Sequence, residues 1–120
     1  MNSADFRKEL VKALPGFDWT VHRTSNHLRL AATGTQSSGF NRLATIEVTR
    51  TEKNDRVWYE AKSRGYGKGG PWAHTNGDLT LARALRGLQQ HYERKANSFR
   101  GLASTLQNAR QSPSAEATNI

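Results

Sequence analysis

The chain has 120 residues, of which 35% are hydrophobic, and its 18 lysines and arginines against 10 acidic residues give a formal net charge of +8. This length and composition support one small core, built from one sheet covered by one or two helices. Cysteine is absent, which excludes a disulfide framework, a thiolate zinc site and a cysteine nucleophile. No segment has the roughly 18 consecutive apolar residues of a membrane span, and residues 1–16 lack the apolar run of a signal peptide. We therefore expect a cytoplasmic protein with no membrane contact.

The positive charge is unevenly distributed along the chain. Residues 62–110 contain nine basic and two acidic residues. An asymmetry of this kind is typical of proteins that bind polyanions. The alternative is charge that serves only solubility.

The N-terminal segment has the spacing of a short amphipathic helix. Phe6 and Leu10 recur at helical spacing, and Ser3 is a suitable N-cap residue. The helix should span about 11 residues, because the Pro-Gly pair at residues 15–16 stops it.

Alternating apolar and polar residues then predict strands with one buried face. The segments are residues 17–23, 27–33, 40–51 and 56–64, separated by turn residues, a polar loop at residues 34–39 and a turn at residues 51–55. Short connections favour an antiparallel meander. The predicted fold is α+β, in the order α-β-β-β-β-α, with a four-stranded antiparallel sheet, a short N-terminal helix and a long C-terminal helix.

The last predicted strand indicates a function for the second face of the sheet. If Val57, Tyr59 and Ala61 face the core, Trp58 must point away from it among basic side chains. An exposed tryptophan flanked by cations can stack on a base while the cations hold phosphate. The predicted binding residues on this sheet are Arg29, Arg56, Trp58, Lys62 and Arg64. The alternative is that Trp58 packs under a loop or the second helix.

A glycine-rich basic loop, GYGKGGPWAHTNG, follows this strand. Its glycines allow close backbone approach to a phosphate, and Tyr66, Lys68 and Trp72 add aromatic rings and a cation. The spacing matches neither a P-loop nor a dinucleotide fingerprint. We therefore predict a binding loop without nucleotide hydrolysis; a ligand-free surface loop is the alternative.

A helix of about 28 residues should follow, capped by Asn76 or Asp78. Arg83 and Arg86 begin a basic stripe on it and complete the predicted nucleic-acid surface. Its apolar seam continues through Phe99, Leu102 and Leu106, beyond the reach of one small sheet. We expect these three residues to pack against a second copy, a protein partner or the first helix. Residues 1–110 should form a single domain, and residues 111–120 should be disordered.

The sequence contains no convincing catalytic or metal-binding motif. The four histidines lack metal-ligand spacing, and we expect no metal, no cofactor and no enzymatic activity. One enzymatic alternative is a small basic ribonuclease that uses His22, Glu47, Glu60 and Arg64 on the sheet.

The order of elements resembles that of double-stranded RNA-binding domains and of Whirly-type and Pur-type single-strand binders. The resemblance is one of topology, since the second helix begins Thr80-Leu81-Ala82-Arg83 where the double-stranded RNA-binding pattern has a lysine pair. The sequence favours a small basic, non-catalytic module that binds RNA or DNA. The main alternative is a small regulatory or inhibitory protein, of the kind that phages and mobile elements encode, that acts on a protein partner.

Overall fold

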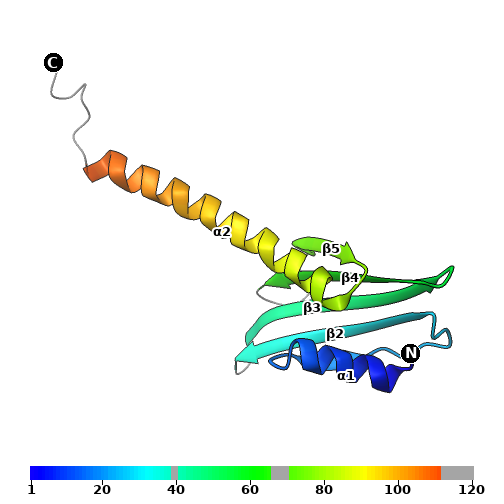
Figure 1. Cartoon of the computed structure of the whole chain (residues 1–120). Coiled ribbons are helices and arrows are strands. Elements are labelled where there is room, and N and C mark those ends of the chain that lie inside the picture. Colours follow the sequence, from blue (N-terminus) through cyan, green and yellow to red (C-terminus); the bar gives the residue numbers. More distant parts are fainter. Residues whose placement is uncertain (39–40, 66–70, 112–120) are drawn as a thin grey trace, which may run out of the picture. The chain divides into compact units, whose positions relative to one another are not determined.

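A computed structural model describes residues 1–38, 41–65 and 71–111. The elements, in chain order, are α1 (Ser3–Ala13), β1 (Asp18–Val21), β2 (Arg29–Ser38), β3 (Asn41–Lys53), β4 (Arg56–Gly65), β5 (His74–Asp78) and α2 (Leu81–Gln111) (Figure 1). The chain divides into two units, the first comprising residues 1–88 and the second beginning at Gln89 within α2. The first unit holds the whole sheet.

The sheet is an antiparallel meander of five strands in the order β1-β2-β3-β4-β5. The predicted α+β class and antiparallel sheet are confirmed, but the count of four strands is wrong. β5 pairs with β4 from Ser63↔His74 to Tyr59↔Asp78 and lies within the segment expected to be a loop. Its sequence, His-Thr-Asn-Gly-Asp, is rich in residues that strands disfavour and shows no apolar alternation. Pairing with β4, rather than intrinsic propensity, makes this segment a strand.

The hairpins differ in detail from the sequence-based expectation. β2 extends to Ser38, so most of the loop expected at residues 34–39 is strand, with a register shift between Gln36 and Ser37. The turn between β3 and β4 is limited to Asn54 and Asp55, whose φ angles are 53° and 61°. Two successive positive φ values are typical of a type I′ turn, which matches the twist of the flanking strands.

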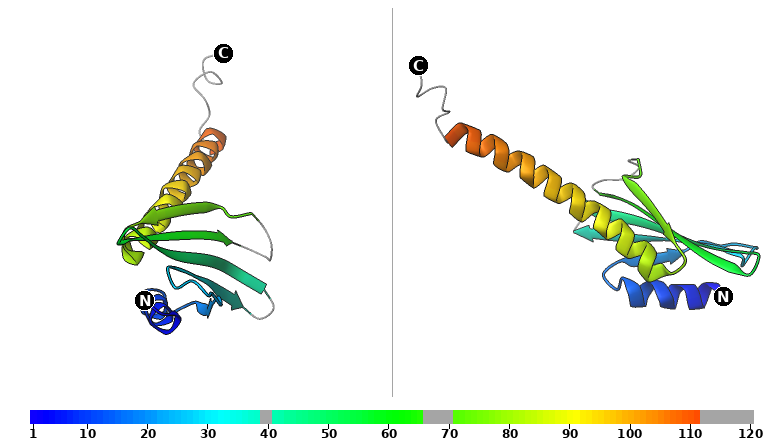
Figure 2. Two further views of the ribbon diagram at one scale, coloured as in Figure 1. Left: turned by 90° about the vertical axis from the view of Figure 1, so that its right-hand side faces the viewer. Right: turned by 45° about the horizontal axis from the view of Figure 1, so that its top comes forward.

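One face of the sheet packs against both helices. Phe6 and Leu10 of α1 and Leu81, Ala84 and Leu88 of α2 are buried. Their partners alternate along the strands, as expected for one buried face: Trp19, Leu30, Ala32, Ile46, Val48, Tyr59 and Ala61. Figure 2 shows α1 and the first turns of α2 on the same side of the sheet. The opposite face carries neither α1 nor the first turns of α2 (Figure 2).

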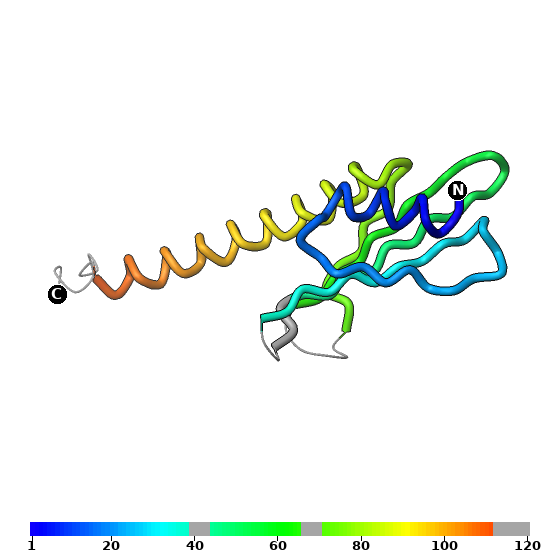
Figure 3. The backbone as a smooth tube through the Cα atoms, turned by 90° about the horizontal axis from the view of Figure 1, so that it is seen from below, coloured from blue at the N-terminus to red at the C-terminus, as the bar shows by residue number. Residues whose placement is uncertain are grey.

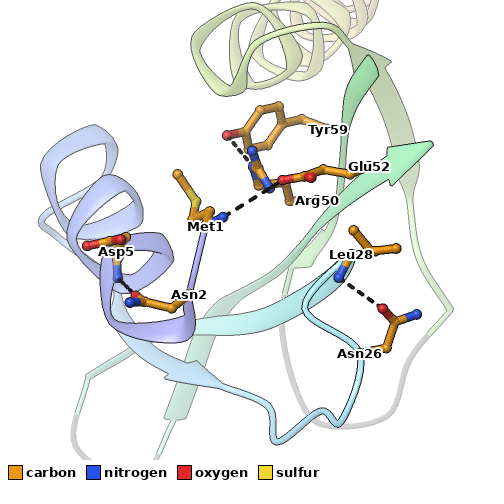
Figure 4. A network of polar contacts seen from close by, with 8 residues as sticks. All are labelled: Met1, Asn2, Asp5, Asn26, Leu28, Arg50, Glu52 and Tyr59. Atoms are coloured by element: carbon orange, nitrogen blue, oxygen red, sulfur yellow. Dashed lines mark hydrogen bonds and ion pairs between the residues drawn. The ribbon is translucent and has the colours of Figure 1, made fainter. Parts of the chain in front are cut away.

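The cap residues of both helices differ from the predicted ones. Asn2, not Ser3, caps α1, and its side chain accepts a hydrogen bond from the Asp5 N–H (2.8 Å; Figure 4). Thr80, not Asn76 or Asp78, caps α2, since its hydroxyl accepts from the Arg83 N–H at 3.2 Å. Asn76 is unavailable because β5 holds it in the sheet. The predicted stop of α1 before the Pro-Gly pair is confirmed.

The start of α2 approaches β5 very closely. The Asn76 side-chain amide donates to the Ala84 carbonyl at 3.0 Å. A Cβ placed on Gly87 would lie 2.2 Å from Asn76 Nδ2. Glycine at this position therefore lets the helix sit directly on the strand.

Candidate nucleic-acid interface

The face opposite the helices, here called the open face, is formed by alternate residues of the five strands. Basic side chains outnumber carboxylates on it: Arg29, Lys53, Arg56, Lys62 and Arg64 lie there with Asp18, Glu47 and Glu60. The predicted orientation of β4, with Tyr59 and Ala61 buried and Trp58 on the other face, is confirmed. The predicted binding residues of β2 and β4 therefore share one surface.

Trp58 lies exposed on this face, seated on a glycine. Gly77 pairs with Glu60 and is thus a diagonal neighbour of Trp58. A Cβ on Gly77 would lie 2.5 Å from Trp58 Cζ2 and 2.8 Å from both Cε2 and Nε1. The indole therefore rests against the Gly77 backbone, while 46% of the residue remains accessible. The first turns of α2 lie on the other face, so Trp58 does not pack under them, whereas residues 66–70 of the loop that was the other half of this alternative lie outside the described residues.

Trp72 is in a different environment, because two cations lie against its ring. Lys62 Nζ is 4.8 Å and Arg64 Cζ 4.6 Å from the ring centroid, distances typical of cation–π contact. Lys62 Nζ also lies 3.7 Å from Glu47 Oε1. Much of the local charge is thus already engaged within the protein.

Thr45 also lies on the open face, cross-strand from Arg64, which contacts the Trp72 ring. It is only 2% exposed. Among the described residues its hydroxyl has no hydrogen-bond partner. The open face is therefore closed over at the Trp72 end and accessible at the Trp58 end.

Arg29 and Arg56 lie toward the accessible end. Arg29 pairs with Thr51, and Thr51 pairs with Trp58, so the three residues form one row across β2, β3 and β4. Both arginines are exposed. Across residues 1–38, 41–65 and 71–111, neither forms an ion pair with a carboxylate. Their charge is available to a ligand.

The remaining predicted binding residues are not brought to this surface. Arg83 and Arg86 lie on α2, which packs against the opposite face, and Arg83 Nε is 3.3 Å from Asp78 Oδ1. Tyr66 and Lys68 lie outside the described residues. The predicted continuous surface from strand to helix is therefore divided between two layers.

The predicted interaction seam on the second half of α2 is exposed. Phe99, Leu102 and Leu106 are 64%, 60% and 67% accessible. They follow at spacings of three and four residues along one helix face. This leaves an apolar stripe open to solvent on that unit.

Sequence reasoning missed a buried polar cluster at the rim of the core (Figure 4). Arg50, only 8% exposed, donates to Glu52 through Nη1 and to the Tyr59 hydroxyl through Nε at 3.1 Å. The Met1 nitrogen lies 3.9 Å from Glu52 Oε1. The strand period was the available signal, because Arg50 and Glu52 continue the core-facing series Ile46, Val48.

The cluster shifts the pKa values of its members. Hydrogen bonding from Arg50 lowers the pKa of Glu52. Burial, followed by a hydrogen bond with Glu9, raises the pKa of Tyr59. Burial opposes the charge of Arg50, but bonding to Glu52 and Tyr59 outweighs it and raises the pKa of the guanidinium. This cluster joins α1 to β3 and β4 and faces away from the open face.

The four residues of the ribonuclease alternative all lie on the open face; they are His22, Glu47, Glu60 and Arg64. His22 Nε2 is hydrogen-bonded to Thr33 Oγ1 at 2.7 Å, and Glu47 is engaged with Lys62. Within the described part of the chain, no group of three or more potential ligand side chains is arranged to hold a metal ion. Neither described helix is long and apolar enough to cross a membrane.

Comparison with protein-family models, curated proteins and solved structures finds no match. We therefore infer the function from the open face itself.

Proposed function

We propose that the protein is a non-catalytic nucleic-acid-binding module that uses the accessible end of its open face, with preference for single strands. A single strand presents unpaired bases that can stack on an exposed ring, whereas a duplex does not. Trp58 supplies the ring, and Arg29 and Arg56 supply charge for the backbone.

The observation that carries the proposal is the seat of Trp58 on Gly77. An exposed indole on a sheet face normally contributes little to the stability of the fold, because its apolar surface remains in water. Here the indole is fixed by close backbone contact and still leaves a large part of its surface open. A fixed ring loses little conformational freedom when a base stacks on it, so the contact favours binding.

The two arginines near Trp58 are free to bind phosphate, because no carboxylate of the described residues pairs with them. Arg29 and Arg56 are exposed and have no ion-pair partner among the described residues, in contrast to Lys62 with Glu47. Guanidinium groups bind phosphate oxygens in pairs of parallel hydrogen bonds. A single strand can contact both arginines with its backbone phosphates and stack one of its bases on the ring.

The test is a binding panel of single- and double-stranded RNA and DNA at two salt concentrations. The wild type should bind the single strands best, and Arg56→Gln should flatten the slope of log affinity against log salt by about 0.7, the value for one lost contact to a single strand. Trp58→Ala should lower affinity by roughly 5- to 150-fold with the slope preserved.

The matched control is Lys8→Gln, which removes one exposed charge from α1 on the helix-covered side. It should bind like the wild type. If wild type binds no nucleic acid at low salt, the proposal fails. If RNA is cleaved during the assay, the ribonuclease hypothesis replaces the proposal of a non-catalytic module.

A further inference from the structure

A hollow opens at the end of the β1–β2 hairpin, next to the exposed ring of Trp58, which we call the Trp58 platform. It is lined by His22, Arg23, Thr24, Asn26, Arg29 and Ala31. Its lining contains two guanidinium groups, an imidazole, a hydroxyl and an amide, and no carboxylate. These are the side chains that bind phosphate oxygens in proteins.

The segment that forms the hollow is braced by its own hydrogen bonds. Thr24 Oγ1 donates to the Asn26 carbonyl and accepts from the Asn26 N–H, both at 3.0 Å. Asn26 Oδ1 accepts from the Leu28 N–H at 3.0 Å (Figure 4), and its carbonyl accepts from the Arg29 N–H at 3.1 Å. The connection therefore holds a defined shape between Arg23 and Arg29.

The positive charge of the hollow is uncompensated. Within the described residues, Arg23 and Arg29 form no ion pair, whereas Arg50, Lys62 and Arg83 each have a carboxylate partner. His22 is fixed against Thr33. Two guanidinium groups that line one hollow without an ion-pair partner repel each other, and a bound anion offsets that repulsion.

The hollow lies close to the Trp58 platform. Arg29 and Trp58 flank Thr51 in register, so their Cα atoms are separated by two strand spacings, roughly 10 Å. The β1–β2 connection and the β3–β4 turn lie at the same end of the sheet (Figure 3). One strand can therefore place a base on Trp58 and a neighbouring phosphate in the hollow.

We infer that the hollow formed by Arg23, Arg29 and His22 is a phosphodiester subsite that holds the backbone of the same strand whose base stacks on Trp58. This inference rests on the proposed function and specifies its geometry: the strand crosses β2, β3 and β4 instead of running along one of them. It also adds Arg23, which lies outside the sheet, to the binding surface.

The test uses short single-stranded oligonucleotides in which one phosphodiester at a time is replaced by an uncharged methylphosphonate. With wild-type protein, one or two positions should weaken binding at least roughly tenfold, as expected for loss of a hydrogen-bonded charge contact. With the Arg23→Gln/Arg29→Gln variant, the same replacements should have no further effect. That variant should also flatten the salt slope by about 1.4, or 0.7 for each contact.

The control variant is Lys8→Gln/Lys12→Gln, which removes two exposed charges from α1, and it should retain wild-type affinity and wild-type position dependence. Uniform weakening at every position overturns the subsite, and wild-type binding by Arg23→Gln/Arg29→Gln overturns both the subsite and the role of Arg29. In either case weaker binding by Trp58→Ala and Arg56→Gln still supports the proposed function. Binding of inorganic phosphate without oligonucleotide binding overturns the shared strand. Absence of any oligonucleotide binding by the wild type overturns both proposals.

Discussion

At the scale of single residues, the seat of Trp58 depends on the missing side chain of Gly77. An alanine Cβ would overlap the indole, so Gly77→Ala should displace Trp58 from its position. We expect weaker binding of single strands, by up to the loss seen for Trp58→Ala, with the salt slope unchanged. Fluorescence anisotropy with a labelled oligonucleotide measures both quantities.

The control for this substitution is Gly65→Ala on β4, where a Cβ meets no atom of the described residues within 4 Å. It adds the same methyl group at a strand position and should bind like the wild type. Equal affinity of Gly77→Ala and wild type would show that the ring position does not matter to the ligand.

The Arg50–Glu52 contact makes stability depend on pH. The pKa of Glu52 is lowered in the folded protein from its ordinary 4.5, so the contact stabilises the fold above that value and the contribution is lost as pH falls through the folded pKa. Between about pH 6 and about pH 3, the melting temperature should fall less in Glu52→Gln than in the wild type. Parallel pH profiles for the two proteins would contradict this role.

At the scale of elements, the two glycines of α2 have opposite roles. A Cβ on Gly101 would meet no described atom within 4 Å, so Gly101→Ala should stabilise its part of the helix by about 1 kcal/mol. At Gly87 the new Cβ meets Asn76, whose amide is held by the Ala84 carbonyl, so Gly87→Ala should lose that bond and destabilise residues 1–88.

Amide hydrogen exchange distinguishes the two glycines by location. Protection should rise around residue 101 in the first variant and fall in β5 and the first turns of α2 in the second. An equal gain in protection from both substitutions would mean that the contact between α2 and β5 is loose.

Elements with periodic sequence were predictable, and elements made by pairing were not. The alternation in β4 placed Trp58 on the open face, and the Pro-Gly pair placed the end of α1. β5 could not be predicted, because Thr75, Asn76 and Gly77 are strand residues only through their pairing with β4 and their contacts with Trp58 and α2. The cap of α2 differs from the prediction for the same reason, since Asn76 is held in β5.

At the scale of the whole molecule, the apolar stripe of α2 determines the expected association state. Phe99, Leu102 and Leu106 have the spacing of a coiled-coil seam, and residues 96–109 contain one charged residue, Arg100. We predict that this stripe pairs with a second copy. The chain mass is 13.4 kDa. Light scattering should give twice this value for the wild type, and Leu102→Glu should restore the monomer. A monomeric wild type would contradict the prediction.

The candidate site was predictable in its parts but not in its arrangement. The sequence indicated Arg29, Arg56 and Trp58, because strand alternation assigns each to a face. It could not indicate that Arg83 lies on the opposite layer, since this follows from where α2 packs. The hollow around Arg23 depends on a turn stabilised by Asn26, which no strand or helix period reveals.

The most direct test of binding through the open face follows the indole N–H signals of the three tryptophans by NMR while a single-stranded oligonucleotide is added. Trp19 is buried and donates to the Leu14 carbonyl at 3.1 Å, so it provides an internal reference. We predict a large, saturable shift for Trp58 and little change for Trp19. If Trp58 does not shift at oligonucleotide concentrations that saturate binding, the open face is not the nucleic-acid-binding surface.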